Sequence, residues 1–134
     1  MKLARHEITI DAAASVVYRY LTEVDGLLQW MAIDAIADPV PGGKLQWTHE
    51  NGATMVGRFV ELTPSRRIVF TYGWDDGLMG LPPESTLVEI DLEERDGRTV
   101  LHLVHRNLPP GAVDAHQQGW VYFLNLLHDT LGSS

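Results

Sequence analysis

The chain has 134 residues, of which 45% are hydrophobic and 21% charged, a composition typical of globular proteins that argues against disorder, collagen and coiled coil. Its 18 acidic and 10 basic residues give a formal net charge of −8. Because the basic residues do not cluster, we expect no binding to nucleic acid and none to an anionic membrane. The chain contains no cysteine, which excludes disulfides, thiol nucleophiles and cysteine-ligated metals and fits a reducing compartment.

The N-terminus lacks an apolar run of signal-peptide length, and no segment reaches the roughly 20 apolar residues that span a bilayer. No repeat, linker or low-complexity stretch divides the chain. These patterns predict a cytoplasmic protein with one domain over residues 1–134.

The first quarter of the chain predicts a strand followed by helix. Residues 3–10 mix polar and apolar side chains with a period of two, which is typical of a strand. Asp11 is expected to cap a helix over residues 12–24, because a carboxylate can accept hydrogen bonds from the free amides of the first turn. Asp25-Gly26 is expected to end that helix, and residues 27–30 can form one more helical turn.

After a predicted loop over residues 38–43 the hydrophobic period becomes two, which predicts a run of antiparallel strands. The predicted strands cover residues 44–49, 55–61, 68–74, 86–92 and 99–106. Turn sequences such as Glu50-Asn51-Gly52 and Asp96-Gly97 separate them and favour hairpins.

The segment Leu108-Pro109-Pro110-Gly111 ends the sheet, and one long helix is expected to follow. Its apolar stripe has helical spacing and consists of Trp120, Phe123, Leu124, Leu127 and Leu131. A sheet with a single apolar face needs a cover, and this helix is the element best able to supply it. The sequence therefore predicts an α+β fold in which a curved sheet wraps around the last helix and leaves a cleft beside it.

Short motifs occur in a fixed order along nearly the whole chain. They are Ile10-Asp11-Ala12-Ala13 with Val16-Val17-Tyr18, Trp30, Pro41-Gly42-Gly43, residues 57–62 with Pro64, residues 68–72, Gly97 with residues 99–105, and Gly119-Trp120 with Leu124 and Leu127. In this order they resemble the activator-of-heat-shock-protein-ATPase-like (AHSA-type) branch of the START-like (SRPBCC) helix-grip superfamily. The resemblance implies a helix-grip fold, also called Bet v-like. In that fold a curved antiparallel sheet of about seven strands grips a long C-terminal helix around an internal cavity, with two short helices after the first strand.

Several functions are compatible with that resemblance. The superfamily includes lipid and sterol carriers, polyketide cyclases, plant hormone receptors and co-chaperone domains, so the fold alone does not select one. Stand-alone domains of this size lack the additional chaperone-binding domain of the eukaryotic activator, and its ATPase-stimulating activity is therefore not carried over.

The inward parity of the strands and the stripe of the last helix predict the lining of the cavity. The candidate ligand-binding residues are Trp47, Met55, Phe59, Phe70, Tyr72, Trp74, Leu103, His105, Trp120, Phe123 and Leu124. Gly57 and Gly119 are expected to withhold side chains from the same interior. A largely apolar pocket with a few polar groups suits a small hydrophobic or aromatic molecule, and no cofactor is expected.

Polar candidates within the cavity are His49, Glu61 and His105, which could make structural hydrogen bonds, contact a ligand or act as a general base. No spacing matches a metal motif, so no metal site is expected, and no catalytic nucleophile can be assigned. His116 is expected on a wetter side of the last helix.

The leading hypothesis is a protein that binds a small hydrophobic molecule and performs no chemistry of its own. One alternative is a cyclase- or hydrolase-like enzyme that uses His105, Glu61 or Tyr72 as acid and base. Another is an interaction module, either a homodimer or a stress-related protein resembling a co-chaperone.

Overall fold

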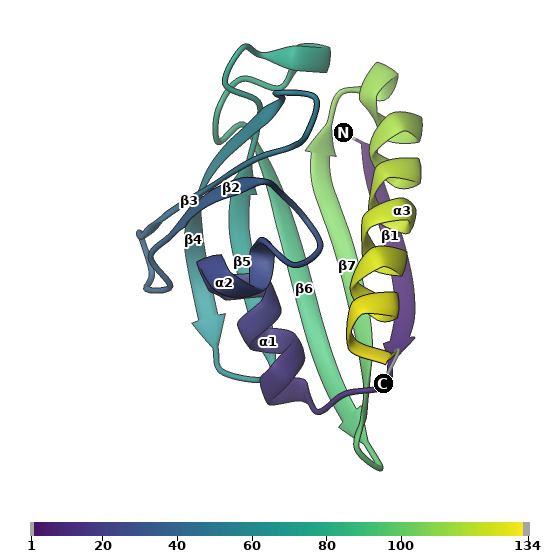
Figure 1. The fold of residues 1–134 in the computed structure, drawn as a ribbon. Coiled ribbons are helices and arrows are strands. Elements are labelled where there is room, and N and C mark those ends of the chain that lie inside the picture. The colour runs from purple at the N-terminus through teal and green to yellow at the C-terminus, as the bar shows by residue number, and fades with distance from the viewer. Residues whose placement is uncertain (1, 133–134) are drawn as a thin grey trace.

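One antiparallel sheet forms the frame of the molecule, seen here in a computed structural model that describes residues 2–132 (Figure 1). Its seven strands within those residues are β1 (Lys2–Ile10), β2 (Asp34–Ala37), β3 (Lys44–Thr48), β4 (Thr54–Thr63), β5 (Arg67–Tyr72), β6 (Thr86–Arg95) and β7 (Arg98–Leu108). They are ordered β1-β7-β6-β5-β4-β3-β2. Residues 1 and 133–134 of the predicted domain lie outside the described residues.

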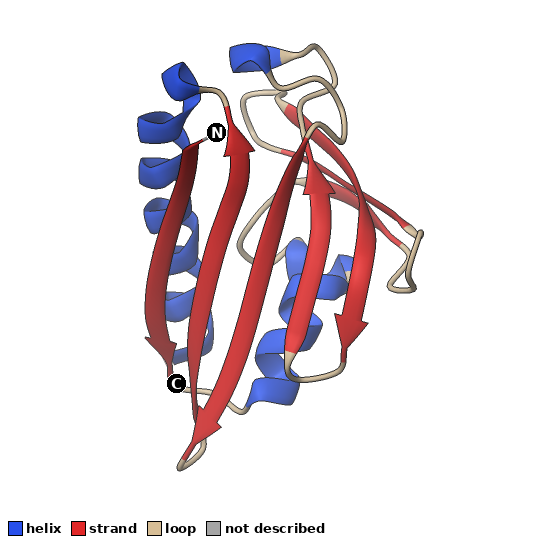
Figure 2. Ribbon diagram, turned by 180° about the vertical axis from the view of Figure 1, so that it is seen from behind, coloured by secondary structure: helices blue, strands red, loops and turns tan. Residues whose placement is uncertain are grey.

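The helices lie on one face of this sheet, as the view from behind shows (Figure 2). They are α1 (Ala14–Thr22), α2 (Val24–Leu27) and α3 (Val113–Gly132). The long helix α3 runs beside β1 and β7, while α1 and α2 cover the other half of the sheet (Figure 1). This arrangement is the α+β helix-grip fold that the sequence predicted. No helix within residues 2–132 is both long and apolar enough to cross a membrane.

The start of α1 differs from the prediction. Ala13, not Asp11, occupies the N-cap position, and it makes no side-chain capping bond. The carboxylate of Glu94 on β6 instead accepts a hydrogen bond of 2.7 Å from the backbone N–H of Ala14. Asp11 lies 3.6 Å from Arg98. The prediction that Asp11 caps the helix is wrong because a strand distant in sequence supplies the capping oxygen.

The end of α1 was also placed too late. The helix stops at Thr22, and Gly26, the expected terminator, lies inside the short helix α2. A Cβ added to Gly26 would come within 2.5 Å of the Cα of Tyr20. Glycine is needed there because the two helices pack backbone against backbone, and not because it stops a helix.

The strand β2 lies at the sheet edge, and the sequence pattern predicted no element for its residues. It pairs with β3 over only four residues. Its one large side chain, Ile36, is 48% exposed, and its half-buried residues are the small Ala35 and Ala37. A short strand without an apolar face shows little of the hydrophobic alternation that predicts a strand. The segment is extended because it pairs with β3.

Candidate ligand-binding site

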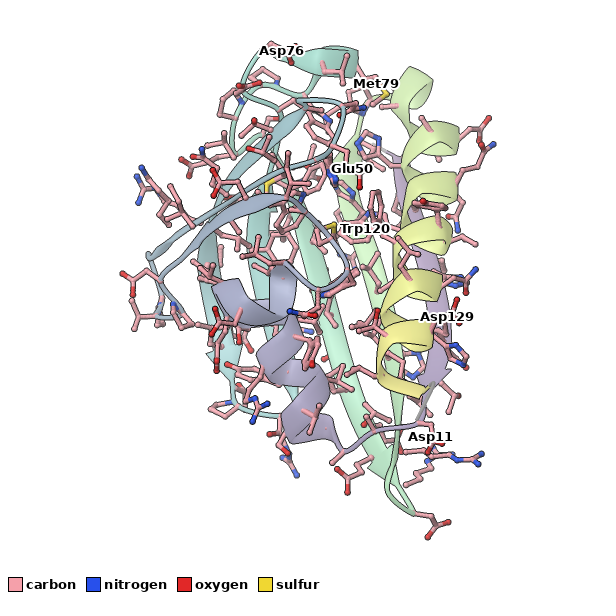
Figure 3. All side chains as sticks on the ribbon, viewed as in Figure 1. Asp11, Glu50, Asp76, Met79, Trp120 and Asp129 are labelled. Atoms are coloured by element: carbon pink, nitrogen blue, oxygen red, sulfur yellow. The ribbon has the colours of Figure 1, made fainter. Side chains whose placement is uncertain are left out.

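A pocket of about 90 Å³ lies between the sheet and the N-terminal half of α3. Its walls are Met31, Trp47, Tyr72, Trp74, Met79, Ala115, His116, Gly119, Trp120 and Phe123. Figure 3 shows Trp120 pointing from α3 toward the sheet, with Met79 beside the N-terminal end of the same helix. Five residues of the predicted lining, Trp47, Tyr72, Trp74, Trp120 and Phe123, are brought together here.

Other residues of the predicted lining do not reach this pocket. Met55, Phe59, Phe70, Leu103 and Leu124 are each at most 3% exposed and belong to the core cluster. They pack the remainder of the space between sheet and helices. The pocket is therefore lined by only part of the set that the sequence predicted for the cavity.

The two interior glycines have different roles. A Cβ added to Gly119 would meet nothing within 4 Å, and this glycine lines the pocket. A Cβ added to Gly57 would lie 1.8 Å from the backbone oxygen of Thr71 on the neighbouring strand. Gly119 leaves space in the interior, as expected. Gly57 instead permits close packing of β4 against β5 and adds no volume to the pocket.

His105 is fully buried, and both of its ring nitrogens are bonded. Its Nδ1 accepts a hydrogen bond of 3.0 Å from the indole N–H of Trp120, so the neutral ring carries its proton on Nε2. That nitrogen lies 2.8 Å from the hydroxyl of Thr86, which donates in turn to the carbonyl of Tyr72. Burial, with a smaller contribution from His116, lowers the pKa of His105 to about 3. Its hydrogen bonds connect α3, β6 and β7 and leave no ring nitrogen for a ligand.

His116 was expected on a wetter side of the last helix, but it is buried and lines the pocket. Its Nδ1 lies 2.8 Å from the carbonyl oxygen of Ala112 and must donate to it. Burial lowers the pKa of His116, although the hydrogen bond to Ala112 opposes this effect. The ring is therefore neutral near pH 7, and its Nε2 is a bare acceptor with no partner among the described residues. The signal that could have found it is spacing, since His116 precedes Trp120 by four residues on the same helical face.

Two further polar side chains, Trp74 and Tyr72, line the pocket. The indole N–H of Trp74 is buried and has no hydrogen-bond partner within residues 2–132. Tyr72 is 5% exposed, its ring packs against that of Trp74, and burial raises the pKa of its hydroxyl. A pocket with aromatic walls thus contains a free donor on Trp74 and a free acceptor on His116.

An outer groove of about 600 Å³ adjoins the pocket. Met31 and Phe123 line both spaces, and His49 lies in the groove with its ring centroid 4.8 Å from that of Phe123. The Nε2 of His49 accepts a hydrogen bond of 3.1 Å from Trp47. Burial lowers the pKa of His49, and the backbone carbonyl of Met31 partly offsets this. His49 is thus placed at the boundary between groove and interior. Glu50 in the following turn also faces α3 (Figure 3).

Glu61 does not lie in the interior, contrary to the prediction. The pairing of β4 with β5 shifts by one residue between Phe59 and Glu61. Because side chains alternate along a strand, one extra residue moves the following side chain to the opposite face. Glu61 is consequently exposed, and its carboxylate lies 3.1 Å from the guanidinium of Arg67. Across the part of the chain that the structure describes, no three His, Asp or Glu side chains are grouped as a metal site would require.

A curved sheet that holds a long C-terminal helix, with a pocket between them, defines the helix-grip class of proteins. Residues 11–132 match the family described as "Activator of Hsp90 ATPase homolog 1-like protein". The chain belongs to this family, which confirms the resemblance found in its motifs. A comparison with curated proteins gives no match.

Solved structures agree with this assignment. The Aha1 dimer from Colwellia psychrerythraea is 28% identical, with a TM-score of 0.81 over 98% of this chain and 96% of that one. Protein MLL2253 from Mesorhizobium loti is similar in fold, with a TM-score of 0.87 at 16% identity over 99% and 98% of the two chains. CalU16 from Micromonospora echinospora also shares the fold, with a TM-score of 0.75 at 20% identity over 97% and 83%.

Proposed function

We propose that the protein binds a small, largely apolar molecule in the pocket between the sheet and α3. The observation that carries this proposal is a pocket with aromatic walls in which buried polar groups have no partner among residues 2–132. Buried donors and acceptors are nearly always satisfied in folded proteins, so unpaired groups around an open volume favour a ligand. Gly119 supports the same role, because glycine inside a helix costs about 1 kcal/mol relative to alanine.

The size of the pocket limits what it can hold without a change of shape. A cavity of about 150 Å³ accommodates benzene, and this pocket has about 90 Å³. Met31 and Met79 form part of the wall, and methionine is the apolar side chain that adapts most easily. We expect these side chains to move when a six-membered ring enters, and a longer ligand to extend past Phe123 into the groove.

The test compares two glycines that both face open space, of which only Gly119 lines the pocket. Toluene, phenol and indole are titrated into the protein and followed by isothermal titration calorimetry and thermal shift. We expect binding to the wild type, loss of binding in Gly119→Leu because leucine fills the pocket, and unchanged binding in Gly111→Leu. Absence of binding to the wild type, or equal binding by the two variants, would contradict the proposal.

Binding without chemistry is favoured over the enzymatic alternative by the positions of the candidate acid–base groups. Such a reaction requires two groups within hydrogen-bond reach of one accessible point. Glu61 is on the outer face of the sheet, and the ring nitrogens of His105 are bonded to Trp120 and Thr86. Tyr72 alone of the predicted groups remains at the pocket.

We also propose that the protein self-associates, because the relative from Colwellia psychrerythraea at 28% identity was solved as a dimer. Leu28, Ile33 and Tyr122 are 41%, 60% and 60% exposed around the outer groove and offer an apolar surface. Light scattering on the eluting protein should give the mass of a dimer at high concentration and a lower mass for Ile33→Glu. A strictly monomeric wild type would contradict this proposal.

A further inference from the structure

The hydrogen-bonding character of the two free groups in the pocket is fixed by the structure. The indole nitrogen of Trp74 can only donate. His116 donates from Nδ1 to the carbonyl of Ala112 at 2.8 Å, so in its neutral form Nε2 can only accept. Each side chain is more than nine-tenths buried, and neither free nitrogen has a partner among the described residues.

The two groups come from different elements and line the same pocket. Trp74 follows β5 and packs on the sheet, whereas His116 belongs to the first turns of α3. Their ring centroids are 6.3 Å apart, and both side chains line the same pocket. Rings this close can turn a donor and an acceptor toward one oxygen atom placed between them, and we expect the two side chains to move in this way when a ligand enters.

The charge of the pocket restricts the ligand further. None of the described residues that line it is lysine or arginine, and the chain has a formal net charge of −8. A carboxylate or phosphate would have no cationic partner in the pocket, and its negative charge would repel the lone pair on Nε2 of His116. The ligand group that matches the pair is neutral, accepts one hydrogen bond and donates another.

We propose that Trp74 and His116 recognise one hydroxyl group of a neutral aromatic ligand. The oxygen accepts a hydrogen bond from Nε1 of Trp74, and the hydroxyl proton is donated to Nε2 of His116. The aromatic ring of the ligand lies among Tyr72, Trp120 and Phe123. This inference rests on the proposed binding function and adds to it a chemical class, phenols and similar hydroxylated rings.

A hydroxyl selects strongly because its absence leaves both protein groups unpaired. A site that hydrogen-bonds a ligand hydroxyl rejects the analogue without that hydroxyl strongly. An apolar site distinguishes two ligands that differ by one methylene much more weakly. We therefore expect phenol to bind at least about tenfold more tightly than toluene. Anisole, whose oxygen accepts but cannot donate, should bind with intermediate affinity.

The experiment measures dissociation constants for phenol, anisole and toluene with the wild type, Trp74→Phe and His116→Phe. Each variant keeps an aromatic ring and removes the polar group, so toluene should bind all three proteins similarly while the preference for phenol falls to about twofold or less. Trp30→Phe is the matched control, because the indole of Trp30 donates to the carbonyl of Tyr20 and lies outside the pocket. This control should retain the full preference.

A spectroscopic measurement on the wild type keeps the test independent of variant stability. The indole N–H resonance of Trp74, identified by its loss in Trp74→Phe, should move downfield with phenol and not with toluene. Equal affinities of the wild type for phenol and toluene, or a full phenol preference in Trp74→Phe, would overturn the recognition pair while leaving the binding function intact. If none of the three probes binds the wild type, the binding function fails and the pair with it.

Discussion

His105 and His116 have ring centroids only 5.2 Å apart, but their chemistry differs. His105 is an internal connector whose nitrogens are both bonded, and His116 keeps one nitrogen free at the pocket. The difference follows from the partner of Nδ1, which accepts from Trp120 in His105 and donates to Ala112 in His116. The sequence pattern placed only His105 inside and expected His116 on a wetter side, so it did not reveal that the two rings meet.

Burial of neutral histidine makes the stability of the fold sensitive to acid. The pKa of His105 is about 3 in the folded protein and about 6.5 when unfolded, so below pH 6.5 the unfolded chain binds more protons. Stability contributed by His105 is therefore complete above pH 6.5 and declines as the pH falls toward 3. Between pH 7 and 5 the free energy of unfolding should fall by about 2 kcal/mol from this group. The lowered pKa values of His116 and His49 act in the same direction.

Urea denaturation at several pH values measures this slope. His105→Gln should flatten it between pH 7 and 5, a range above the ordinary carboxylate pKa values. His128→Gln, at an exposed position of α3, should leave the slope unchanged. A slope that is identical in the wild type and His105→Gln would show that His105 does not cause the acid sensitivity.

Among the elements, α1 depends on a residue 80 positions away. The carboxylate of Glu94 bonds the N–H of Ala14, one of the amides that a helix cannot satisfy internally. A negative charge at a helix N-terminus also interacts favourably with the helix dipole. The position of α1 on the sheet is thus coupled to the end of β6.

Removal of this cap should have a measurable cost. Glu94→Ala should lower the free energy of unfolding by about 1 kcal/mol, the usual effect of losing a helix cap. Glu93→Ala is the natural comparison, because Glu93 lies next to Glu94 and pairs with the exposed Arg95, and it should cost less than about 0.5 kcal/mol. Equal destabilisation by the two substitutions, measured by urea denaturation, would refute the capping role.

The edge strand β2 and the bulge in β4 are the two features of the sheet that the sequence pattern did not predict. The alternation in residues 55–59 was correct, and Met55 and Phe59 are buried. The same alternation placed Glu61 inside because a period of two assumes an unbroken ladder. A bulge is a property of the pairing between β4 and β5, so the sequence of β4 does not reveal it.

For the molecule as a whole, Trp120 links the helix to the sheet. It is 5% exposed, bonds His105 on β7, and forms part of the pocket wall. One of the contacts between α3 and the sheet is therefore made by a side chain that also shapes the pocket. Stability and binding are coupled at this residue.

Trp120→Ala should destabilise the fold by about 3 to 5 kcal/mol, because it removes a large buried side chain and leaves Nδ1 of His105 unpaired. Tyr122→Ala on the same helix should change stability by less than about 0.5 kcal/mol, since Tyr122 is 60% exposed. Urea denaturation followed by circular dichroism measures both. A small effect of Trp120→Ala would mean that α3 is held to the sheet by other contacts.

Apart from β2, the order of strands and helices, the inward parity of most strands and the family could be predicted from the amino-acid sequence. The elements and their inner faces can be predicted because a hydrophobic period of two or of 3.6 residues depends only on residues close together in the chain. Trp47, Tyr72, Trp74, Trp120 and Phe123 were placed on the inner faces for this reason, and they meet at the pocket.

The size and polarity of the pocket were decided by the three-dimensional structure. The burial of His116, the exposure of Glu61 and the cap from Glu94 each depend on residues distant in the chain or on a one-residue shift in pairing. Local periodicity assigns a side chain to a face of its element, but it does not specify what fills the space opposite. Packing between the sheet and α3 closed most of the expected cavity and left one pocket next to Gly119, with His116 and Trp74 in its walls.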